Sequence, residues 1–221
     1  MSSTWGEVLG RYTTAQQAAG RSPGTVRLHR YYLTDLAGHH TSPWTVTRRD
    51  LEVFLARPHW KPETRKSCRT VVRGFYRWAH GVGYISTDPA LDLMPVTIPA
   101  AVARPAPELL VKRLVAEQGR VGVMAMLAAY CGLRRAEIAR VHSRDLVGEE
   151  LLVLGKGGKL RAVPVMNPSL LAAIEAADGW VFPNGHGSHL TPGHVGRLLS
   201  ESMPVGWSAH TLRHRMASTA Y

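Results

Sequence analysis

The sequence is poor in cysteine, in long apolar runs and in acidic residues, and each shortage narrows the class of protein. Its two cysteines, Cys68 and Cys131, lie far apart in apolar, helix-like stretches of the 221-residue chain. We therefore expect two buried thiols in a reducing compartment and no disulfide framework. No apolar run reaches the length of a membrane span, and the N-terminus lacks a signal-peptide pattern. These shortages predict a soluble, cytoplasmic protein that has no membrane partner.

The shortage of acidic residues leaves a strong positive charge. The chain has 16 Asp and Glu against 27 Lys and Arg, which gives a formal net charge of +11. Both halves of the chain are basic, so the charge does not come from a single tail. Such a field favours a polyanionic partner, either a nucleic acid or an anionic membrane surface.

Four segments near the N-terminus carry apolar residues at helical spacing and are joined by short polar loops. Ser22 precedes Pro23 at one helix start, and Thr47 precedes another, as expected of N-cap residues. The pattern predicts a small helical bundle. The predicted helices cover residues 5–19, 23–37, a short stretch after 47, and 62–80.

The fourth predicted helix has a basic residue at every fourth position and an apolar opposite face. Acidic partners four residues away are nearly absent, so these charges are not neutralised along the helix. A solvated helix face is the simple alternative. We predict instead that this stripe contacts DNA, because the net charge of the chain favours a polyanion. The basic stripe consists of Lys61, Arg65, Arg69, Arg73 and Arg77.

Prolines and small residues then mark a linker over 96–106, between a first domain, 1–95, and a second domain, 107–221. The second domain combines helical and strand patterns. Expected there are helices over 107–118, 120–131, 168–177 and 192–203, one helix after Leu133, a strand over 180–182, and a last helix that Ser208 caps.

A glycine-rich stretch with two lysines, Gly155-Lys156-Gly157-Gly158-Lys159, separates two apolar runs, 151–154 and 160–165. This pattern predicts a β-hairpin with a lysine at its tip. It is not a nucleotide-binding P-loop, because Leu160 follows Lys159 where a Ser or Thr is needed. No metal site is expected either, since the histidines of the next loop have no acidic or cysteine partner at ligand spacing. Those histidines are His186, His189 and His194.

The most informative stretch is His210-Thr211-Leu212-Arg213-His214, at the start of the last predicted helix. His210 and Arg213 are three residues apart and share a helix face, where an imidazole, a guanidinium and free backbone N–H groups suit a phosphate. Two other segments belong with this one: Gly132-Leu133-Arg134 with Glu137-Ile138, and Gly155-Lys156-Gly157 with Lys159 and Arg161.

In order, spacing and context, these three elements resemble the tyrosine recombinase family, the phage-integrase type of site-specific DNA recombinase. The resemblance covers most of the chain. It implies a mainly α fold, in which a helical core-binding domain of the SAM-like four-helix type precedes an α+β catalytic domain with a small antiparallel sheet. It also implies a homotetramer on a double-stranded DNA attachment site, in the cytoplasm of a bacterial host, for phage or mobile-element integration or excision.

The resemblance assigns roles to four residues. Arg134 and Arg213 would hold the scissile phosphate, His210 would stand beside them, and Lys156 would be the general acid for the leaving 5′ oxygen. Two permanently charged guanidiniums can hold both non-bridging oxygens, so the reaction needs no metal or other cofactor. A covalent 3′-phosphotyrosine keeps the bond energy, so rejoining needs no ATP.

Four further residues match supporting or DNA-contacting positions of the family. Glu137 and His214 would support the residues that touch the phosphate. Lys159 and Arg161, on the hairpin, would add DNA contacts to those of the basic stripe.

The sequence departs from the family pattern at its end. In the family the nucleophilic tyrosine lies several helical turns beyond the His-x-Leu-Arg-His segment, whereas Tyr221 is eight residues past Arg213. A continuous helix would separate the two residues by about 12 Å. We therefore expect the 221-residue chain alone not to cleave DNA, either as a piece of a longer recombinase or as a short form that only binds DNA. A relative of the type IB topoisomerases is a third hypothesis.

Overall fold

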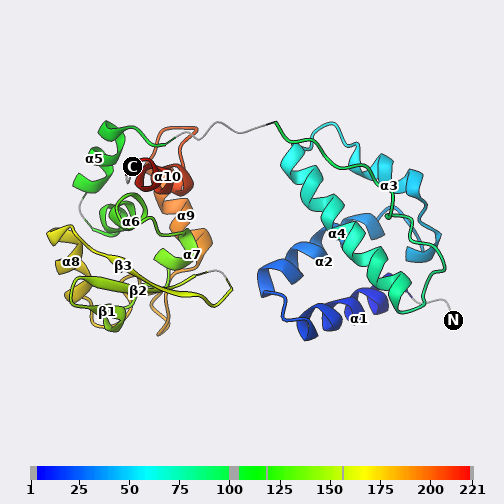
Figure 1. Ribbon diagram of the computed structural model, residues 1–221, viewed down its shortest axis with the longest axis horizontal. Helices are drawn as coiled ribbons and strands as arrows, with labels where there is room; N and C mark the ends of the chain where they lie inside the picture. Colours follow the sequence, from blue (N-terminus) through cyan, green and yellow to red (C-terminus); the bar gives the residue numbers. More distant parts are fainter. Residues whose placement is uncertain (1–3, 100–104, 118, 156, 220–221) are drawn as a thin grey trace. The chain divides into compact units, whose positions relative to one another are not determined.

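The computed structural model describes residues 4–99, 105–117, 119–155 and 157–219, apart from the side chains of 217–219 (Figure 1). The chain forms two compact units, residues 1–100 and 101–221, and their boundary falls within the predicted linker. No helix in the described ranges is both long and apolar enough to cross a bilayer. We describe each unit separately.

The described residues of the first unit form four α-helices and one short 3-10 turn (Figure 1). Side-chain caps start three of the helices: Thr4, Ser22 and Thr47 each accept a hydrogen bond from a backbone N–H of the first turn. The predicted helices are confirmed to within about two residues at each end. They are α1 (Trp5–Ala18), α2 (Pro23–Ala37), α3 (Arg48–Leu55) and α4 (Pro62–Gly81), with the 3-10 turn at Pro43–Thr45.

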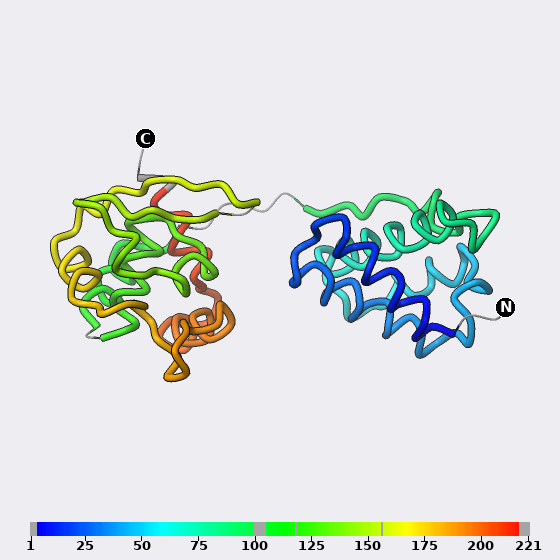
Figure 2. Tube along the Cα trace, turned by 90° about the horizontal axis from the view of Figure 1, so that it is seen from below, coloured from blue at the N-terminus to red at the C-terminus, as the bar shows by residue number. Residues whose placement is uncertain are grey.

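The core of this unit forms around the apolar face of α4. Phe75 and Tyr76 are fully buried, and their ring centroids lie 5.0 Å apart. Tyr12 of α1 packs its ring 5.3 Å from Phe75, edge to face. Figure 2 shows α1 and α2 running side by side, and both α2 and α3 contact α4. The fourth helix is therefore the element against which this unit packs.

In the second unit, the part of the chain that the structure describes forms six α-helices and a small sheet. The predicted core helix α6 is confirmed, because it is buried on nearly all sides and contacts α5, α7, α8, α9 and α10. The helices are α5 (Glu108–Ala116), α6 (Arg120–Ala129), α7 (Arg135–Ile138), α8 (Pro168–Glu175), α9 (Pro192–Glu201) and α10 (Ala209–Thr219), with a 3-10 turn at Ser143–Asp145.

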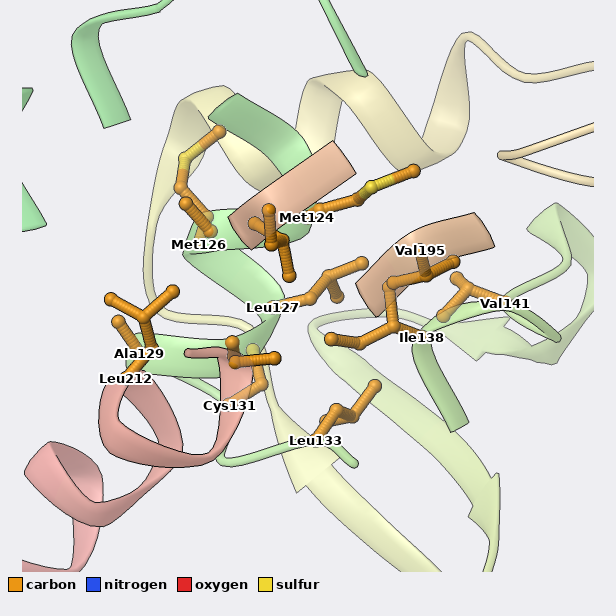
Figure 3. Close-up of a cluster of buried hydrophobic side chains, with 14 of the residues drawn as sticks. Met124, Met126, Leu127, Ala129, Cys131, Leu133, Ile138, Val141, Val195 and Leu212 are labelled. Atoms are coloured by element: carbon orange, nitrogen blue, oxygen red, sulfur yellow. The ribbon is translucent and has the colours of Figure 1, made fainter. Parts of the chain in front are cut away.

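Side chains from four of these helices meet in one buried cluster (Figure 3). Leu127 of α6, Ile138 of α7, Val195 of α9 and Leu212 of α10 are all fully buried. Leu212 belongs to the His-x-Leu-Arg-His segment, so the apolar residue of that motif fixes the start of α10 in the core. The polar residues of the motif are thereby directed away from the core.

The sheet has three antiparallel strands in the order β1-β2-β3, built from β1 (Leu146–Val147), β2 (Glu150–Leu154) and β3 (Leu160–Pro164). The predicted hairpin is β2–β3, with Leu154 opposite Leu160 and Glu150 opposite Pro164. The two-residue strand β1 was not predicted. A mainly helical fold with a small antiparallel sheet is confirmed.

The predicted strand over 180–182 is wrong. Trp180 forms only an isolated bridge with His142, and Pro183 forms another with His189. Gly179, whose φ is +101°, turns the chain before this segment, and Pro183 has no N–H to extend a ladder after it. The apolar run is therefore an irregular segment that is stabilised by burial of Phe182.

The two cysteines are buried as predicted, with Cys68 in the first core and Cys131 in the second. Burial raises the pKa of the Cys68 thiol to about 12 and that of the Cys131 thiol to about 11. Both side chains therefore act as small apolar core residues.

Candidate functional site

The turn between α6 and α7 places Arg134 at the edge of the second unit. Gly132 ends the preceding segment with a φ of +62°, and a β-carbon there would lie 3.0 Å from the sulfur of Met216 in α10. Leu133 is then buried, and its N–H donates to the Leu127 carbonyl at 3.0 Å. Glycine is thus required both for the backbone and for close packing of α10. The turn leaves Arg134 as the residue that precedes the first turn of α7.

Glu137 holds Arg134 through two contacts. Its carboxylate accepts from the Arg134 backbone N–H at 2.7 Å and from the Arg134 guanidinium, through Nη1, at 3.0 Å. The Glu137 side chain is only 3% exposed, whereas that of Arg134 is 50% exposed. The buried carboxylate therefore fixes the base of an arginine whose outer side faces solvent.

A second arginine, Arg161 of β3, binds the same carboxylate. It donates from Nη1 to Oε1 at 3.1 Å and from Nη2 to Oε2 at 2.8 Å, a bidentate pair with Glu137. Arg161 was predicted to contact DNA, and the pairing with Glu137 is an additional role inside the protein that was not predicted. The strand alternation offered a signal, because Arg161 shares the inward face of β3 with the buried Val163.

The two arginines keep Glu137 ionised. Burial of the carboxyl group raises its pKa, but hydrogen bonds from Arg161 and Arg134 outweigh that effect and lower the pKa to about 2. Glu137 was predicted as a supporting residue. The geometry gives it a definite position at the junction of α7 and the hairpin.

The root of the hairpin lies against this pair. A β-carbon on Gly155 would lie 3.0 Å from Nη1 of Arg161 and 3.7 Å from Oε1 of Glu137. The Gly155 N–H donates to the Lys159 carbonyl at 2.8 Å, which closes the hairpin. Lys156 lies outside the described residues, and its predicted role stays a prediction. Its neighbour Gly155, however, is located directly beside the Arg161–Glu137 pair.

Arg213 of α10 is close enough to this cluster to interact with it electrostatically. Its pKa is lowered by burial and by the positive charge of Arg134, while Glu137 acts in the opposite direction and Arg161 lowers it further. Its guanidinium makes no hydrogen bond to any other described residue. Two arginines from separate segments therefore bind one buried carboxylate, a third lies within electrostatic reach of it, and the charge that remains is positive.

His210 and His214 form a pair one turn apart on α10. Their Nε2 atoms lie 2.8 Å apart, and the ring centroids are separated by 4.1 Å. Burial lowers the pKa of His210, and so do the nearby His214, Arg213 and Arg135. His210 therefore lies near three other basic side chains, with Arg213 on the same helix.

The first turn of α10 is anchored at both ends. Ser208 directly precedes α10, at the position predicted for the N-cap, and its carbonyl accepts from the Thr211 and Leu212 N–H groups at 3.0 and 3.2 Å. The Thr211 hydroxyl in turn accepts from the Ser208 N–H at 3.0 Å and donates to the Ser208 carbonyl at 2.7 Å. The Thr211 carbonyl accepts from the Ala106 N–H at 3.1 Å. The sequence reading missed this role of Thr211, although a hydroxyl in the first helical turn is a recognisable signal.

The basic stripe on α4, in the first unit, does not act as one surface. Arg65 donates to the carbonyls of Leu55 and Arg57 at 2.7 and 3.1 Å, so it ties α4 to the end of α3. Arg69 and Arg73 each donate, at 3.2 Å, to backbone carbonyls of the segment that follows α4. The other two stripe residues, Lys61 and Arg77, are exposed, as is Lys159 on the hairpin.

The cluster in the second unit can bind an anion without a metal ion. In the part of the chain that the structure describes, no three His, Cys, Asp or Glu side chains are grouped as metal ligands. Guanidiniums are planar donors that hold two oxygens of a phosphate in bidentate fashion. An anion held there would face Arg134 and Arg213, whose N–H groups are not all used within the protein.

Comparison with known proteins agrees with this geometry. No family model matches the chain. The tyrosine recombinase XerD of Caulobacter vibrioides is 30% identical over 221 residues, which cover 85% of this chain and 65% of the relative. XerC of Shewanella amazonensis is 28% identical over 98% of this chain and 81% of its own, and XerA of Pyrococcus furiosus is 25% identical over 96% and 79%.

Solved structures show the same fold. A lambda integrase dimer bound to a COC' core site superposes with a TM-score of 0.78 at 18% identity, over 98% of this chain and 69% of that one. The XerH recombinase bound to a difH substrate gives a TM-score of 0.65 at 17% identity, over 100% and 74%. The chain belongs to the tyrosine recombinase family, as its sequence motifs predicted. It spans just under two thirds of the length of the XerD relative and about four fifths of the XerC and XerA relatives.

Proposed function

We propose that this chain is a site-specific DNA recombinase that cuts and rejoins duplex DNA through a 3′-phosphotyrosine. The observation that carries the proposal is a cluster in which Arg134 and Arg161 bind the buried carboxylate of Glu137, with Arg213 within electrostatic reach of all three. Three cations and one anion leave a net positive site, which suits a backbone phosphate.

In the proposed reaction, a tyrosine oxygen attacks the scissile phosphorus. The new bond joins phosphorus to the tyrosine oxygen, and the bond to the 5′ oxygen breaks. Negative charge gathers on the two non-bridging oxygens as the fifth ligand approaches, and Arg134 and Arg213 stabilise that charge. Rejoining is the reverse attack by a 5′ hydroxyl, so no external energy source is consumed.

Two other residues handle protons in this proposal. Lys156, beside Gly155, gives its proton to the leaving 5′ oxygen as general acid. The His210 imidazole lies within hydrogen-bond distance of His214, and a ring N–H of this pair can donate to a non-bridging oxygen. Tyr221 lies outside the described residues, so the structure does not assign the nucleophile. The covalent trapping experiment identifies the tyrosine that carries it.

The partner we propose is a double-stranded attachment site, bound by four copies of the chain. One solved relative is titled as a lambda integrase tetramer on a Holliday junction, which supports this assembly. We place the reaction in the cytoplasm of a bacterial host, where it integrates or excises a phage or another mobile element. The basic stripe, Lys159 and the net charge of +11 support DNA as the substrate.

The test is a covalent trapping experiment. The chain first selects its site from a library of random duplexes, and that site is then made with a nick near the cleavage point, so that the cleaved end is lost by diffusion. With the protein as its host makes it, we expect a covalent protein–DNA species, and peptide mass spectrometry then gives the tyrosine that carries the DNA. The 221-residue chain alone is expected to bind the same site without forming that species.

The matched variants separate chemistry from binding. Arg213→Ala should abolish the covalent species and leave site binding within a few-fold of wild type, because other contacts hold the DNA. Arg197→Ala, an exposed arginine paired with Glu201 on α9, is the control and should keep the covalent species. Site-selective binding without any covalent species would support the second candidate, a non-catalytic DNA-binding protein. Relaxation of supercoiled DNA without site preference would favour a type IB topoisomerase.

A further inference from the structure

The first unit contains a hollow of about 580 Å³ between α1, α2 and α4, which we call the basic hollow. No carboxylate lines it among the described residues. Its lining therefore carries positive charge with no counter-charge, unlike the cluster around Glu137 in the second unit. The charged and titratable side chains that line it are Arg21, His29, Arg69, Arg73 and Arg77.

Local backbone geometry fixes Arg21 at the rim. Gly20 adopts a φ of +67° after the last turn of α1, and the Arg21 N–H donates to the Gln16 carbonyl at 3.0 Å. This is the Schellman arrangement that ends many helices, and it needs glycine at the left-handed position. It holds an exposed arginine beside the carbonyl end of α1, where the helix dipole favours a cation. Arg21 does not belong to the basic stripe of α4.

The floor of the hollow is polar. The Tyr12 hydroxyl lies 3.1 Å from Nδ1 of His29, and a β-carbon on Gly74 would lie 3.1 Å from that hydroxyl. Only glycine at position 74 lets the pair reach α4 at this distance. When Tyr12 donates to Nδ1, the proton of the His29 ring is on Nε2 and is available to a ligand.

The rim arginines have unused donors. Arg73 donates from Nη2 to the Leu91 carbonyl, and its other N–H groups make no hydrogen bond to any described residue. The guanidiniums of Arg21 and Arg77 make no hydrogen bond to any described residue. Arg21 is nonetheless close to the floor, since its charge acts on both Tyr12 and His29.

We propose that the basic hollow holds one backbone phosphate of duplex DNA, bound by Arg21, Arg73 and Arg77 at the rim with His29 beneath. This inference rests on the proposed function, because it takes DNA as the ligand. It differs from the stripe prediction, in which contacts follow α4 alone. Here the contact needs the α1–α2 turn, and Arg65 and Arg69 serve the fold.

The experiment measures affinity for a random-sequence duplex over a range of salt concentrations, with the full chain. The variants are Arg21→Gln, Arg77→Gln and the double variant, and thermal denaturation verifies folding. Each single variant should bind about tenfold more weakly, as expected for a lost charged hydrogen bond. Because both arginines hold the same phosphate, the double variant should lower the slope of log K against log salt by about 1, not 2. Arg48→Gln, an exposed cation of the same unit paired with Glu52, should change neither quantity.

Each outcome decides the matter. A slope that stays at the wild-type value in the double variant overturns the basic hollow and leaves the recombinase proposal intact. A fall of about 2 in the slope of log K against log salt would show that the two arginines bind separate phosphates, and it would overturn the proposal of one shared phosphate. Wild-type chain that fails to bind any duplex overturns both proposals. Titration with inorganic phosphate distinguishes a DNA backbone phosphate from free phosphate as the ligand. If inorganic phosphate binds only when Arg21 is present, and Arg21→Gln leaves the duplex affinity unchanged, DNA is not the ligand of the basic hollow.

Discussion

Glu137→Gln is the substitution that tests the candidate site most directly. The carboxylate is 3% exposed and accepts four hydrogen bonds, two from Arg134 and two from Arg161. Glutamine has the same shape but no charge, and its NH₂ group would face a guanidinium. Removing one partner of a buried ion pair costs about 3–5 kcal/mol. The lower end of that range applies here, because the guanidiniums left without a counter-charge, Arg134 and Arg161, are 50% and 36% exposed and water can solvate them.

Proton linkage gives a second estimate of the stability that the ionised Glu137 contributes. The pKa of Glu137 falls from 4.5 to about 2 on folding. A shift of about 2.5 units at 1.36 kcal/mol per unit corresponds to about 3 kcal/mol of stability. The folded-state pKa is depressed, so this stability is fully present above pH about 4.5 and is lost as the pH falls towards about 2. Glu137→Gln removes this contribution, and the difference from wild type should shrink across the same interval.

The assay is denaturant unfolding at several pH values, with hydrogen exchange of α7 and β3 amides to assign the change to the second unit. We expect a loss of about 3 kcal/mol at pH 7. Glu201→Gln is the control: Glu201 is 57% exposed in its pair with Arg197, and its loss should stay below about 1 kcal/mol. A loss for Glu137→Gln no larger than for Glu201→Gln would refute the argument that this carboxylate organises the site.

Three glycine substitutions test the close contacts by thermal denaturation. Gly74→Ala should destabilise the first unit by about 1–3 kcal/mol, since its β-carbon would press on the Tyr12 hydroxyl. Gly10→Ala, also in a helix but with open space around it, should stabilise the unit by about 0.5–1 kcal/mol. Equal effects at the two positions would contradict the close packing of Gly74 against Tyr12. Gly155→Ala should cost about 1–3 kcal/mol, because its β-carbon would meet Arg161 and the hairpin carbonyl at position 159. Unchanged stability there would mean that the hairpin root does not lie on the Arg161–Glu137 pair.

The fold could be predicted from the sequence where apolar spacing and caps agree. Thr47 and Ser22 start helices where the sequence placed them, and the face of α4 that contains Phe75 is buried as expected. The strand over 180–182 could not be excluded, because a short apolar run has the same pattern whether or not a partner strand exists. Its pairing depends on His142, which no local rule connects to it.

The site was predictable in its residue types and less so in its connections. Motif spacing indicated Arg134 and Arg213, but not that Glu137 would bind Arg134 and Arg161 together. That link joins residues 24 positions apart and arises only once β3 packs beside α7. A long-range contact was also missed on α4. Arg65 has the spacing of an exposed charge in the sequence, but it is hydrogen-bonded to the end of α3.

The Glu137 carboxylate couples the position of the hairpin to that of Arg134. Arg134 reaches its position through α7, whereas Arg161 and the neighbouring Gly155 belong to the hairpin, and Glu137 is bonded to both arginines. A displacement of the hairpin root therefore cannot occur without stretching hydrogen bonds that also hold Arg134. Because charge-assisted bonds to a buried carboxylate are costly to break, the hairpin root and Arg134 must be ordered together. In the recombinase that we propose, Glu137 would order them without touching the DNA.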